Sequence, residues 1–355
     1  MKIFNNYNLA KLNTLRIQAK AKFFVEIEKE SELQELFLMP EFKNNKKFFL
    51  GSGSNILFTG DFGGVVVKVS MLGKKVIEEN SESVLLEVAA GEVWHDLVTY
   101  AVSNNFGGVE NLAFVPGTVG AAPVQNIAAY GESFSDVFIS LDAFNVETGK
   151  IEKFNKEECK FGYRESVFKK EFKNKYIILK VRLQLLKNPQ IEDSYYQIGI
   201  TRDSVKEEMN KIAIPPFYIK DVYQAVINIR SRKLPDPLKI PNAGSSFLNS
   251  VVSRKKYEEL KEEDSELQSY PVGGLSYKTI NDGEDFVKVA TGRLLQNLGW
   301  LGKWIGNVGV HDKHALIIVT NGKATGEEVV NFIEMIKKSY FDKYGIKLET
   351  EVNLI

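Results

Sequence analysis

A stretch rich in glycine and proline constrains this chain more than any other feature. Residues 110–131, ENLAFVPGTVGAAPVQNIAAYG, are mostly apolar but are broken repeatedly by proline and glycine. The stretch has no helical or strand period long enough for ordinary core. Small residues at this density let the backbone come close to something large and flat. The Pro–Gly and Gly–Ala–Ala steps would present free N–H groups to an anion. The alternative interpretation is a buried loop with a packing role.

Length and composition limit the classes of protein that remain. A chain of 355 residues predicts two or three domains with ample core. Lys+Arg and Asp+Glu both number 46, and this zero net charge argues against nucleic acid as the main partner. Cys159 is the only cysteine, which excludes an internal disulfide and a cysteine metal cluster. With only three histidines, a zinc enzyme is not expected, and we predict no metal.

The ends and the apolar runs of the chain bear on its location. The first residues, MKIFNNYNLAKLNTLRI, lack the basic-then-apolar order of a signal peptide. No stretch approaches the roughly 18 apolar residues of a membrane span. We therefore expect a cytoplasmic protein that does not enter a membrane.

Periodicity along the chain predicts an α+β protein in three regions. Residues 1–70 read as a small α/β lobe, and 71–218 as a β-rich lobe with one clear helix and a segment of little period at 188–216. In region 219–345, Asp221 with Gln224 resembles a capping box, and Thr325 with Glu328 predicts another. Residues 346–355 alternate as a final strand, which we assign to the first lobe.

The loop GSGSN at 51–55 follows a predicted strand, as phosphate-binding loops often do. It lacks both the Gly-Lys-Ser/Thr ending of a Walker loop and the third glycine of a dinucleotide fingerprint. Alone it is better explained as a strand-end turn. Together with 110–131 it supplies a second set of backbone donors for a pyrophosphate.

Four further segments carry groups suited to catalysis or anion binding. Arg164 in FGYR either binds a carboxylate or phosphate through its planar fork or lies at a surface corner. The basic residues within 230–233 lie at the end of a predicted helix. A favourable interaction with the helix dipole explains their position, and binding of a substrate phosphate is the alternative. Ser245 has no nucleophile-elbow motif around it, which disfavours a triad hydrolase, but it could donate a proton. Glu351 is a candidate only if its face of the final strand lines a cleft. The residues alone thus indicate a soluble α/β protein with phosphate-binding loops.

Taken together, the segments resemble the UDP-N-acetylenolpyruvoylglucosamine reductase family, whose members are flavoenzymes of peptidoglycan precursor synthesis. The resemblance covers almost the whole chain, from 13 to 352, and segment 188–216 is similar to the tyrosine loop of the longer subtype. Its most specific pieces are GSGSN (51–55), the 110–131 stretch, FGYRES (161–166), KLPDP (233–237), NAGSSF (242–247) and LETEV (348–352).

The resemblance implies a cofactor and a fold. FAD would bind non-covalently between the first two lobes, in the fold of vanillyl-alcohol oxidase-type flavoproteins, and 219–345 would be a substrate-binding domain. NADPH would reduce the flavin. The implied cofactor-binding residues are Gly51, Ser52, Gly53, Ser54, Asn55, Pro116, Gly117, Thr118, Gly120 and Asn126.

The resemblance also implies a reaction. The reduced flavin would deliver hydride to the enolpyruvyl group of a UDP-sugar, which is the only expected partner of a monomeric enzyme. Arg164 and Glu351 would stabilise the resulting enol, and Ser245 would provide the proton. The product serves cell-wall synthesis, and through it cell shape and division. The implied substrate-binding residues are Tyr163, Tyr196, Lys233, Asn249 and His314.

Two departures and two alternatives remain. Asn353 stands where the family commonly has arginine, and His314 where it often has Gln or Asn, which affects local uridine or diphosphate contacts. One alternative is an oxidase of the same fold with flavin bound covalently to His95 or Cys159. The other is a nucleotide-sugar sensor without catalysis, against which Arg164, Ser245 and Glu351 stand together.

Overall fold

The computed structural model describes residues 1–189, 191, 205–272 and 285–355. Tyr196 and most of the predicted tyrosine loop lie outside these residues. Contacts divide the chain into two compact units. Unit 1 comprises residues 1–7, 22–52 and 63–232, and unit 2 comprises 8–21, 53–62 and 233–355. The division into two flavin lobes and a substrate domain stays a prediction.

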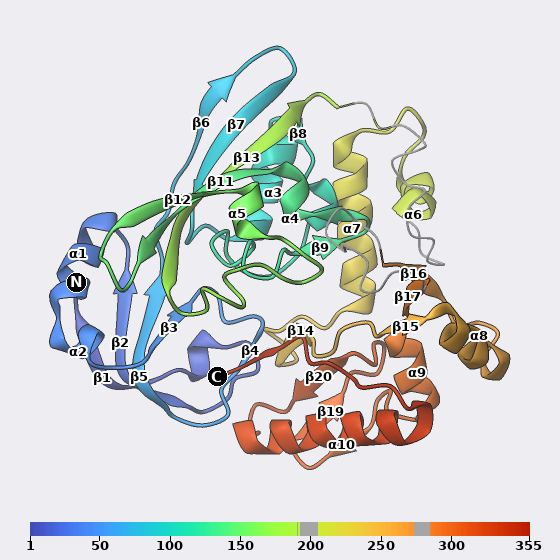
Figure 1. Cartoon of the computed structure of the whole chain (residues 1–355). Coiled ribbons are helices and arrows are strands. Elements are labelled where there is room, and N and C mark those ends of the chain that lie inside the picture. Colours follow the sequence, from blue (N-terminus) through green and yellow to red (C-terminus); the bar gives the residue numbers. More distant parts are fainter. Residues whose placement is uncertain (190, 192–204, 273–284) are drawn as a thin grey trace. The chain divides into compact units, whose positions relative to one another are not determined.

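The first sheet of unit 1 has four strands in the order β1-β2-β5-β3 (Figure 1). β3 and β5 pair in parallel, with Phe48 opposite Val66, and the central run of β5 is buried on both sides, as parallel strands usually are. Two helices follow β2. The elements are β1 (Ile3–Asn8), β2 (Lys20–Ile27), α1 (Glu30–Leu38), α2 (Pro40–Lys43), β3 (Lys47–Leu50) and β5 (Phe62–Val69).

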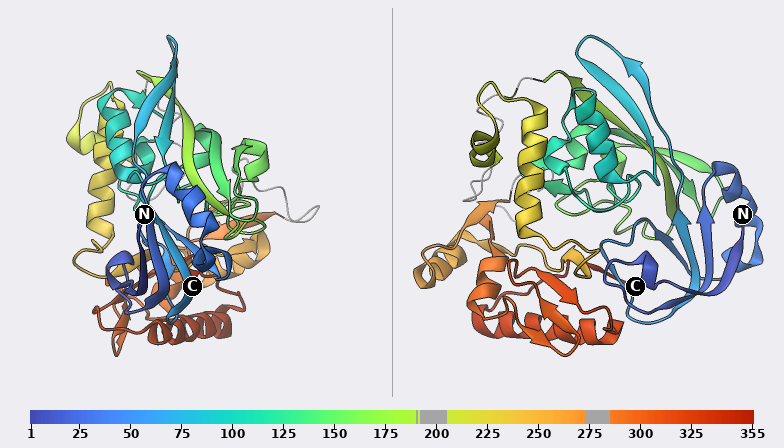
Figure 2. Two further views of the ribbon diagram at one scale, coloured as in Figure 1. Left: turned by 90° about the vertical axis from the view of Figure 1, so that its left-hand side faces the viewer. Right: turned by 180° about the vertical axis from the view of Figure 1, so that it is seen from behind.

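The second sheet of unit 1 is antiparallel, in the order β12-β11-β13-β7-β6, with β8 also paired to β13. The β6–β7 hairpin projects beyond the rest of this sheet (Figure 2). Its elements are β6 (Lys74–Glu79), β7 (Ser83–Ala89), β8 (Phe106–Gly107), β11 (Phe138–Asn145), β12 (Ile151–Asn155) and β13 (Tyr176–Lys187). Around it lie α3 (Trp94–Ser103), η2 (Glu110–Leu112), the β9–β10 hairpin (Ala128–Ala129, Glu132–Ser133), α4 (Phe134–Val137), α5 (Lys156–Cys159), α6 (Val205–Ile212) and α7 (Ile219–Lys233).

Strand β13 shows how alternation in the sequence builds this sheet. Leu179, Val181, Leu183 and Leu185 are all buried, as the alternating pattern predicts. On the opposite face Arg182 donates two bonds of 2.8 Å to the Asp142 carboxylate. That pair holds the pKa of Asp142 below its usual range, because the guanidinium hydrogen-bonds the charged form.

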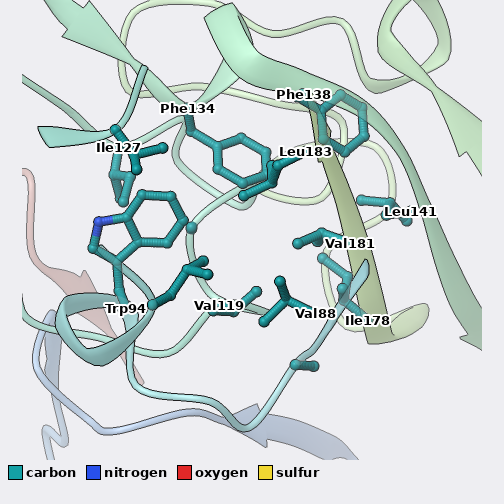
Figure 3. Close-up of a cluster of buried hydrophobic side chains, with 14 of the residues drawn as sticks. Val88, Trp94, Val119, Ile127, Phe134, Phe138, Leu141, Ile178, Val181 and Leu183 are labelled. Carbon is teal, nitrogen blue, oxygen red and sulfur yellow. The ribbon is translucent and has the colours of Figure 1, made fainter. Parts of the chain in front are cut away.

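One cluster in the core of unit 1 combines three aromatic side chains, Trp94, Phe134 and Phe138, with aliphatic residues packed around them (Figure 3). Trp94 of α3 meets Phe134 edge to face at 5.9 Å between ring centroids, and its indole N–H donates to the Leu112 carbonyl at 3.1 Å. Val119 of the 110–131 stretch is fully buried beside these residues. The stretch is therefore anchored in the core.

Unit 2 has a four-stranded antiparallel sheet in the order β14-β20-β19-β18 and a three-stranded sheet in the order β15-β17-β16. Its elements are η1 (Ala10–Leu12), β4 (Ile56–Leu57), β14 (Asn242–Ser245), β15 (Val251–Ser253), α8 (Arg254–Glu263), β16 (Ser269–Pro271), β17 (Phe286–Val289), α9 (Thr291–Asn297), β18 (Trp304–Ile305), β19 (Val308–Val310), β20 (Ile317–Thr320), α10 (Gly326–Tyr344) and β21 (Asn353–Leu354).

The capping predictions had different outcomes. Thr325 and Glu328 form the predicted box at the start of α10, and Gly345 ends this helix at φ +67°. The prediction for Asp221 with Gln224 was wrong. The Asp221 carboxylate instead accepts the Tyr218 amide at 2.8 Å, because α7 already begins at Ile219.

The C-terminal strand is shorter than predicted. Only Asn353 and Leu354 form a strand, β21, which pairs in parallel with β4 of the same unit. Leu354 of this strand is 43% exposed. Alternation in the sequence therefore indicated the right segment but the wrong extent of pairing. No helix among the described residues is long and apolar enough to cross a bilayer.

Candidate functional site

The 110–131 stretch is held by backbone bonds to the region where β7 leads into α3. The Gly120 amide donates to the Ala90 carbonyl at 2.8 Å, and the Val119 amide donates to Glu92 at 2.8 Å. The Gly117 carbonyl accepts from Trp94 at 3.0 Å. A Cβ on Gly120 would lie 2.6 Å from the Ala90 Cβ, so only glycine allows this approach. The lack of periodicity in the sequence reflects a loop shaped by contacts with another segment.

The turn at 117–118 has amides that these backbone bonds do not use. Among the described residues, the N–H groups of Gly117 and Thr118 have no protein acceptor, and Gly117 adopts φ +128°. Gly51 lies against the same turn, since its Cβ would come within 2.6 Å of Thr118 Oγ1. Glycines in close approach with open amides form a cradle suited to an anionic group such as a pyrophosphate. The residues of unit 1 thus fit the diphosphate of a dinucleotide cofactor.

The GSGSN loop passes from unit 1 into unit 2 between Ser52 and Gly53. Gly53 adopts φ +69°, and a Cβ there would meet the Leu12 carbonyl oxygen at 2.0 Å. Thr14 donates its amide to the Gly53 carbonyl at 3.1 Å. The Asn55 carbonyl accepts both the Asn353 amide and its side-chain Nδ2, at 3.1 and 3.0 Å. Asn353, the departure noted in the sequence, therefore supports this loop.

The tertiary structure joins Arg164 to the 110–131 stretch. It adopts φ +56° in a tight turn closed by two bonds between Gly162 and Glu165, and its Nη2 donates to the Ala128 carbonyl at 2.8 Å. The Asn126 side chain donates to the Gly162 carbonyl at 3.1 Å and accepts the Ser135 amide at 2.9 Å. Asn126 thus links the loop to the turn that carries Arg164. The guanidinium also lies 5.7 Å from the ring centroid of Tyr163.

Ser245 and Glu351 come from neighbouring segments of unit 2. Ser245 ends β14 opposite Ile317 of β20. The next residue, Ser246, accepts the Glu351 amide at its carbonyl at 2.8 Å, and Phe247 pairs antiparallel with Thr350. Two residues far apart in the sequence are thereby held side by side. Both side chains are partly exposed, as a reactive group must be.

The predicted substrate residues in unit 2 occupy different positions. Asn249 accepts the Thr291 amide through Oδ1 at 3.3 Å, at the start of α9. His314 precedes β20, with its carbonyl accepting the Ile317 amide at 3.0 Å. Lys233 is the last residue of α7. Arg164 and Tyr163 belong to unit 1.

The basic cluster at the end of α7 does not serve the helix dipole alone. Arg232 forms two bonds with the Glu208 carboxylate of α6, at 2.7 and 2.9 Å. Arg230 donates instead to the Phe114 carbonyl at 3.2 Å. Sequence reasoning missed the contact between Arg230 and the 110–131 stretch. No local signal could have shown it, since 116 residues separate the partners.

The two residues considered for a covalent flavin are poorly suited to it. Cys159 is fully buried, and burial with two nearby glutamates raises the pKa of its thiol to about 12, so it stays protonated. His95 uses Nδ1 to accept the Phe114 amide at 3.1 Å. These contacts favour a non-covalent cofactor.

The comparisons with known proteins agree with this geometry. A family model described as an FAD binding domain matches residues 21–155. A second, described as the C-terminal domain of UDP-N-acetylenolpyruvoylglucosamine reductase, matches 236–355. Fold and loop together define a flavoprotein oxidoreductase with an FAD-binding domain and a separate C-terminal domain, which confirms the predicted fold class.

Full-length relatives identify the family. The UDP-N-acetylenolpyruvoylglucosamine reductase of Flavobacterium johnsoniae is 41% identical, with 100% of both chains covered. That of Bdellovibrio bacteriovorus is 38% identical over 99% of both. The crystal structure of the Thermus caldophilus enzyme matches 99% of this chain and 98% of its own with a TM-score of 0.65 and 20% identity, which shows the shared fold. The chain belongs to the UDP-N-acetylenolpyruvoylglucosamine reductase family.

Proposed function

We propose that this chain reduces UDP-N-acetylglucosamine enolpyruvate to UDP-N-acetylmuramate for peptidoglycan precursor synthesis, with FAD as cofactor and NADPH as electron donor. The observation that carries the proposal is the turn at 117–118, whose amides have no protein acceptor among the described residues and whose Thr118 side chain lies against Gly51, in a domain that matches an FAD-binding family. Relatives at 41% and 38% identity over the full chain support the substrate.

The residues assigned to FAD fall into two groups. Gly51, Gly117 and Thr118 offer backbone amides and close approach for the diphosphate. Asn126 and Gly120 hold the loop in place through contacts with its neighbours. Ser52, Gly53, Ser54, Asn55 and Pro116 complete the proposed set. When bound and reduced by NADPH, FAD supplies the hydride for the enolpyruvyl methylene carbon.

We assign two tasks to residues of this chain: stabilising the charge that develops in the reaction and donating the proton. Hydride addition leaves negative charge on the adjacent carbon, in conjugation with the substrate carboxylate. We assign Arg164 and Glu351 to stabilise or polarise the resulting enol, and the cationic Arg164 in particular, since a cation aimed at developing negative charge contributes most to catalysis. The Ser245 hydroxyl gives its proton to the adjacent carbon, and the double bond is thereby saturated. Tyr163, Tyr196, Lys233, Asn249 and His314 are assigned to substrate contacts.

A rapid-mixing experiment tests the reaction. The holoenzyme is reduced anaerobically with NADPH and mixed with the enolpyruvyl UDP-sugar while flavin absorbance is followed. We expect return of the oxidised spectrum and formation of one UDP-N-acetylmuramate per flavin. UDP-N-acetylglucosamine, which lacks the enol ether, is the control and should leave the flavin reduced. Bleaching without return on the enolpyruvyl substrate would contradict the proposal and point to another oxidoreductase of this fold.

The remaining expectations belong to the same proposal. We propose a monomeric cytoplasmic enzyme. Light scattering on the holoenzyme should give a mass near the 40.1 kDa of one chain. A mass of twice that value would contradict the monomer and leave the reaction unaffected.

A further inference from the structure

Phe114, inside the proposed flavin loop, is held in an unusual backbone conformation. It adopts φ +60°, a left-handed region that bulky residues rarely occupy. Its ring is 40% exposed, so burial of the side chain does not explain the conformation. The surrounding structure must therefore hold the backbone from elsewhere.

Two side chains hold the two peptide groups of Phe114. His95 Nδ1 accepts its amide N–H at 3.1 Å, and Arg230 Nε donates to its carbonyl at 3.2 Å. His95 comes from the first turn of α3 and Arg230 from the last turn of α7. An acceptor on α3 and a donor on α7 thus fix the orientation of the Phe114 backbone, which lies two positions before Pro116.

The His95 ring is itself positioned. It stacks on Tyr223 of α7 at 5.8 Å between centroids with a 12° interplanar angle, and the Tyr223 hydroxyl bonds Thr99 Oγ1 of α3 at 2.8 Å. The Phe114 ring meets the imidazole edge to face at 5.6 Å. The ring therefore has one orientation, with Nδ1 toward the loop.

The bond to Phe114 requires a neutral imidazole, since Nδ1 can accept only when it carries no proton. Asp96 on α3 and Arg230 on α7 are the charged groups that act on His95. Burial is the main cause that lowers the pKa of His95; Asp96 opposes this and Arg230 adds to it. Arg230 in turn is near Arg164 and bonds Tyr130.

We infer that His95 is a positioning residue for the flavin: its neutral imidazole, with Arg230, orients Phe114 and so the 117–118 turn that faces the cofactor diphosphate. Protonation of His95 would set its Nδ1–H against the Phe114 N–H, so that two donors face each other. It would also place a second cation beside Arg230. Both effects would release the loop. The inference rests on the proposed function, because it concerns retention of the same FAD.

The direction of the pH effect follows from the lowered pKa. A histidine held neutral by the fold contributes its stabilisation above its ordinary pKa of about 6.5. That contribution is lost as the pH falls through the lower folded value. FAD should therefore be retained at pH 7.5 and released on mild acidification, while the rest of the fold is intact.

The test measures FAD release from the holoenzyme by flavin fluorescence between pH 7.5 and 5.0, with circular dichroism at each pH. His95→Asn keeps an acceptor oxygen near the Nδ1 position but cannot titrate, and His95→Ala removes the acceptor at every pH. His311→Asn is the matched control, since His311 is also a largely buried histidine of lowered pKa, with its Nδ1 accepting the Lys313 amide at 3.3 Å in unit 2.

We expect the wild-type FAD dissociation constant to rise about tenfold over this range, equivalent to one lost bond of ~1.4 kcal/mol. His95→Asn should bind FAD nearly as the wild type does at pH 7.5 and show a flat pH profile. His95→Ala should bind about tenfold more weakly throughout, and His311→Asn should follow the wild type.

Two results would overturn the inference while FAD binding itself stands: equal pH profiles for the wild type and His95→Asn, or unchanged affinity in a folded His95→Ala. Loss of dichroism in step with fluorescence would assign the release to unfolding and also overturn it. A wild-type protein that takes up no FAD at pH 7.5 would overturn the proposed function and this inference together.

Discussion

Single residues in this chain owe their roles to neighbours far along the sequence. In the sequence, Arg164 is one arginine in a β-rich segment. In the structure, its guanidinium donates to the Ala128 carbonyl. In the sequence, Ser245 resembles a turn serine. In the structure, the carbonyl of the next residue, Ser246, accepts the Glu351 amide. In both cases the sequence already indicates the residue as a candidate, and the tertiary contact shows which distant segment holds it in place.

Replacement of Ser245 tests the proposed proton donor. Ser245→Ala should leave flavin reduction by NADPH nearly unchanged and slow flavin reoxidation by the enolpyruvyl substrate ~10²–10⁴-fold, the usual contribution of a general acid. Rapid mixing resolves the two half-reactions. The control is Ser253→Ala, which removes the acceptor for the Lys256 amide at the start of α8; it should cost about 1 kcal/mol of stability and leave both rates unchanged. Equal slowing of both half-reactions by Ser245→Ala would reject the assignment.

At the scale of elements, the loops that carry the site are rigid because neighbouring segments approach them closely. The glycines serve different needs: Gly53 requires both a left-handed conformation and space, whereas Gly51 and Gly120 require space alone. By contrast, α10 needs only local signals, since its capping box and terminal glycine lie within the helix and its ends. Helices of this kind are the part of the fold that a sequence predicts best.

A methyl group at Gly51 tests the close approach to Thr118. Gly51→Ala would place a Cβ 2.6 Å from Thr118 Oγ1, so the Thr118 side chain or the turn that carries it must shift, at a cost of about 1–3 kcal/mol. We expect FAD affinity to fall roughly tenfold or more, measured by flavin fluorescence. Gly63→Ala, where a Cβ meets nothing within 4 Å, should bind FAD as the wild type does. Unchanged affinity in Gly51→Ala would show that the cofactor does not depend on this turn.

At the scale of the whole molecule, the stability of the fold depends on ion pairs that have one buried partner. The Glu208 carboxylate is only 5% exposed and is paired with Arg232. This pairing lowers the pKa of Glu208 to about 2. In unit 2, Arg293 and Asn297 likewise lower the pKa of Asp264 to about 2. Both carboxylates stabilise the fold above their ordinary pKa values.

Acid unfolding should show this contribution. As the pH falls from about 4.5 toward 2, Glu208 in the folded protein keeps its charge longer than in the unfolded chain, and its stabilisation is progressively lost. Glu208→Gln should therefore be less stable at pH 7 and lose less further stability between pH 5 and 3, as followed by thermal unfolding. Glu171→Gln, at an exposed pair with Lys160, should keep the wild-type slope. Parallel slopes for all three proteins would contradict the prediction.

The sequence by itself determined the fold class, the family and the nature of the cofactor. The reason is that six short motifs in fixed order, together with alternation in β13 and the caps of α10, are local patterns that a chain displays directly. Where a local pattern was ambiguous, as with Asp221 and the final strand, prediction gave the segment but misplaced the start of α7 and the length of β21.

Only the tertiary structure decided which side chains hold the proposed flavin loop. The bonds from His95 and Arg230 to Phe114 span 19 and 116 residues, and Asn353 reaches Asn55 across 298. No periodicity or propensity carries information over such distances, because these extend a few residues along the chain. Partners of this kind are selected by packing of whole elements, which brings distant donors and acceptors together.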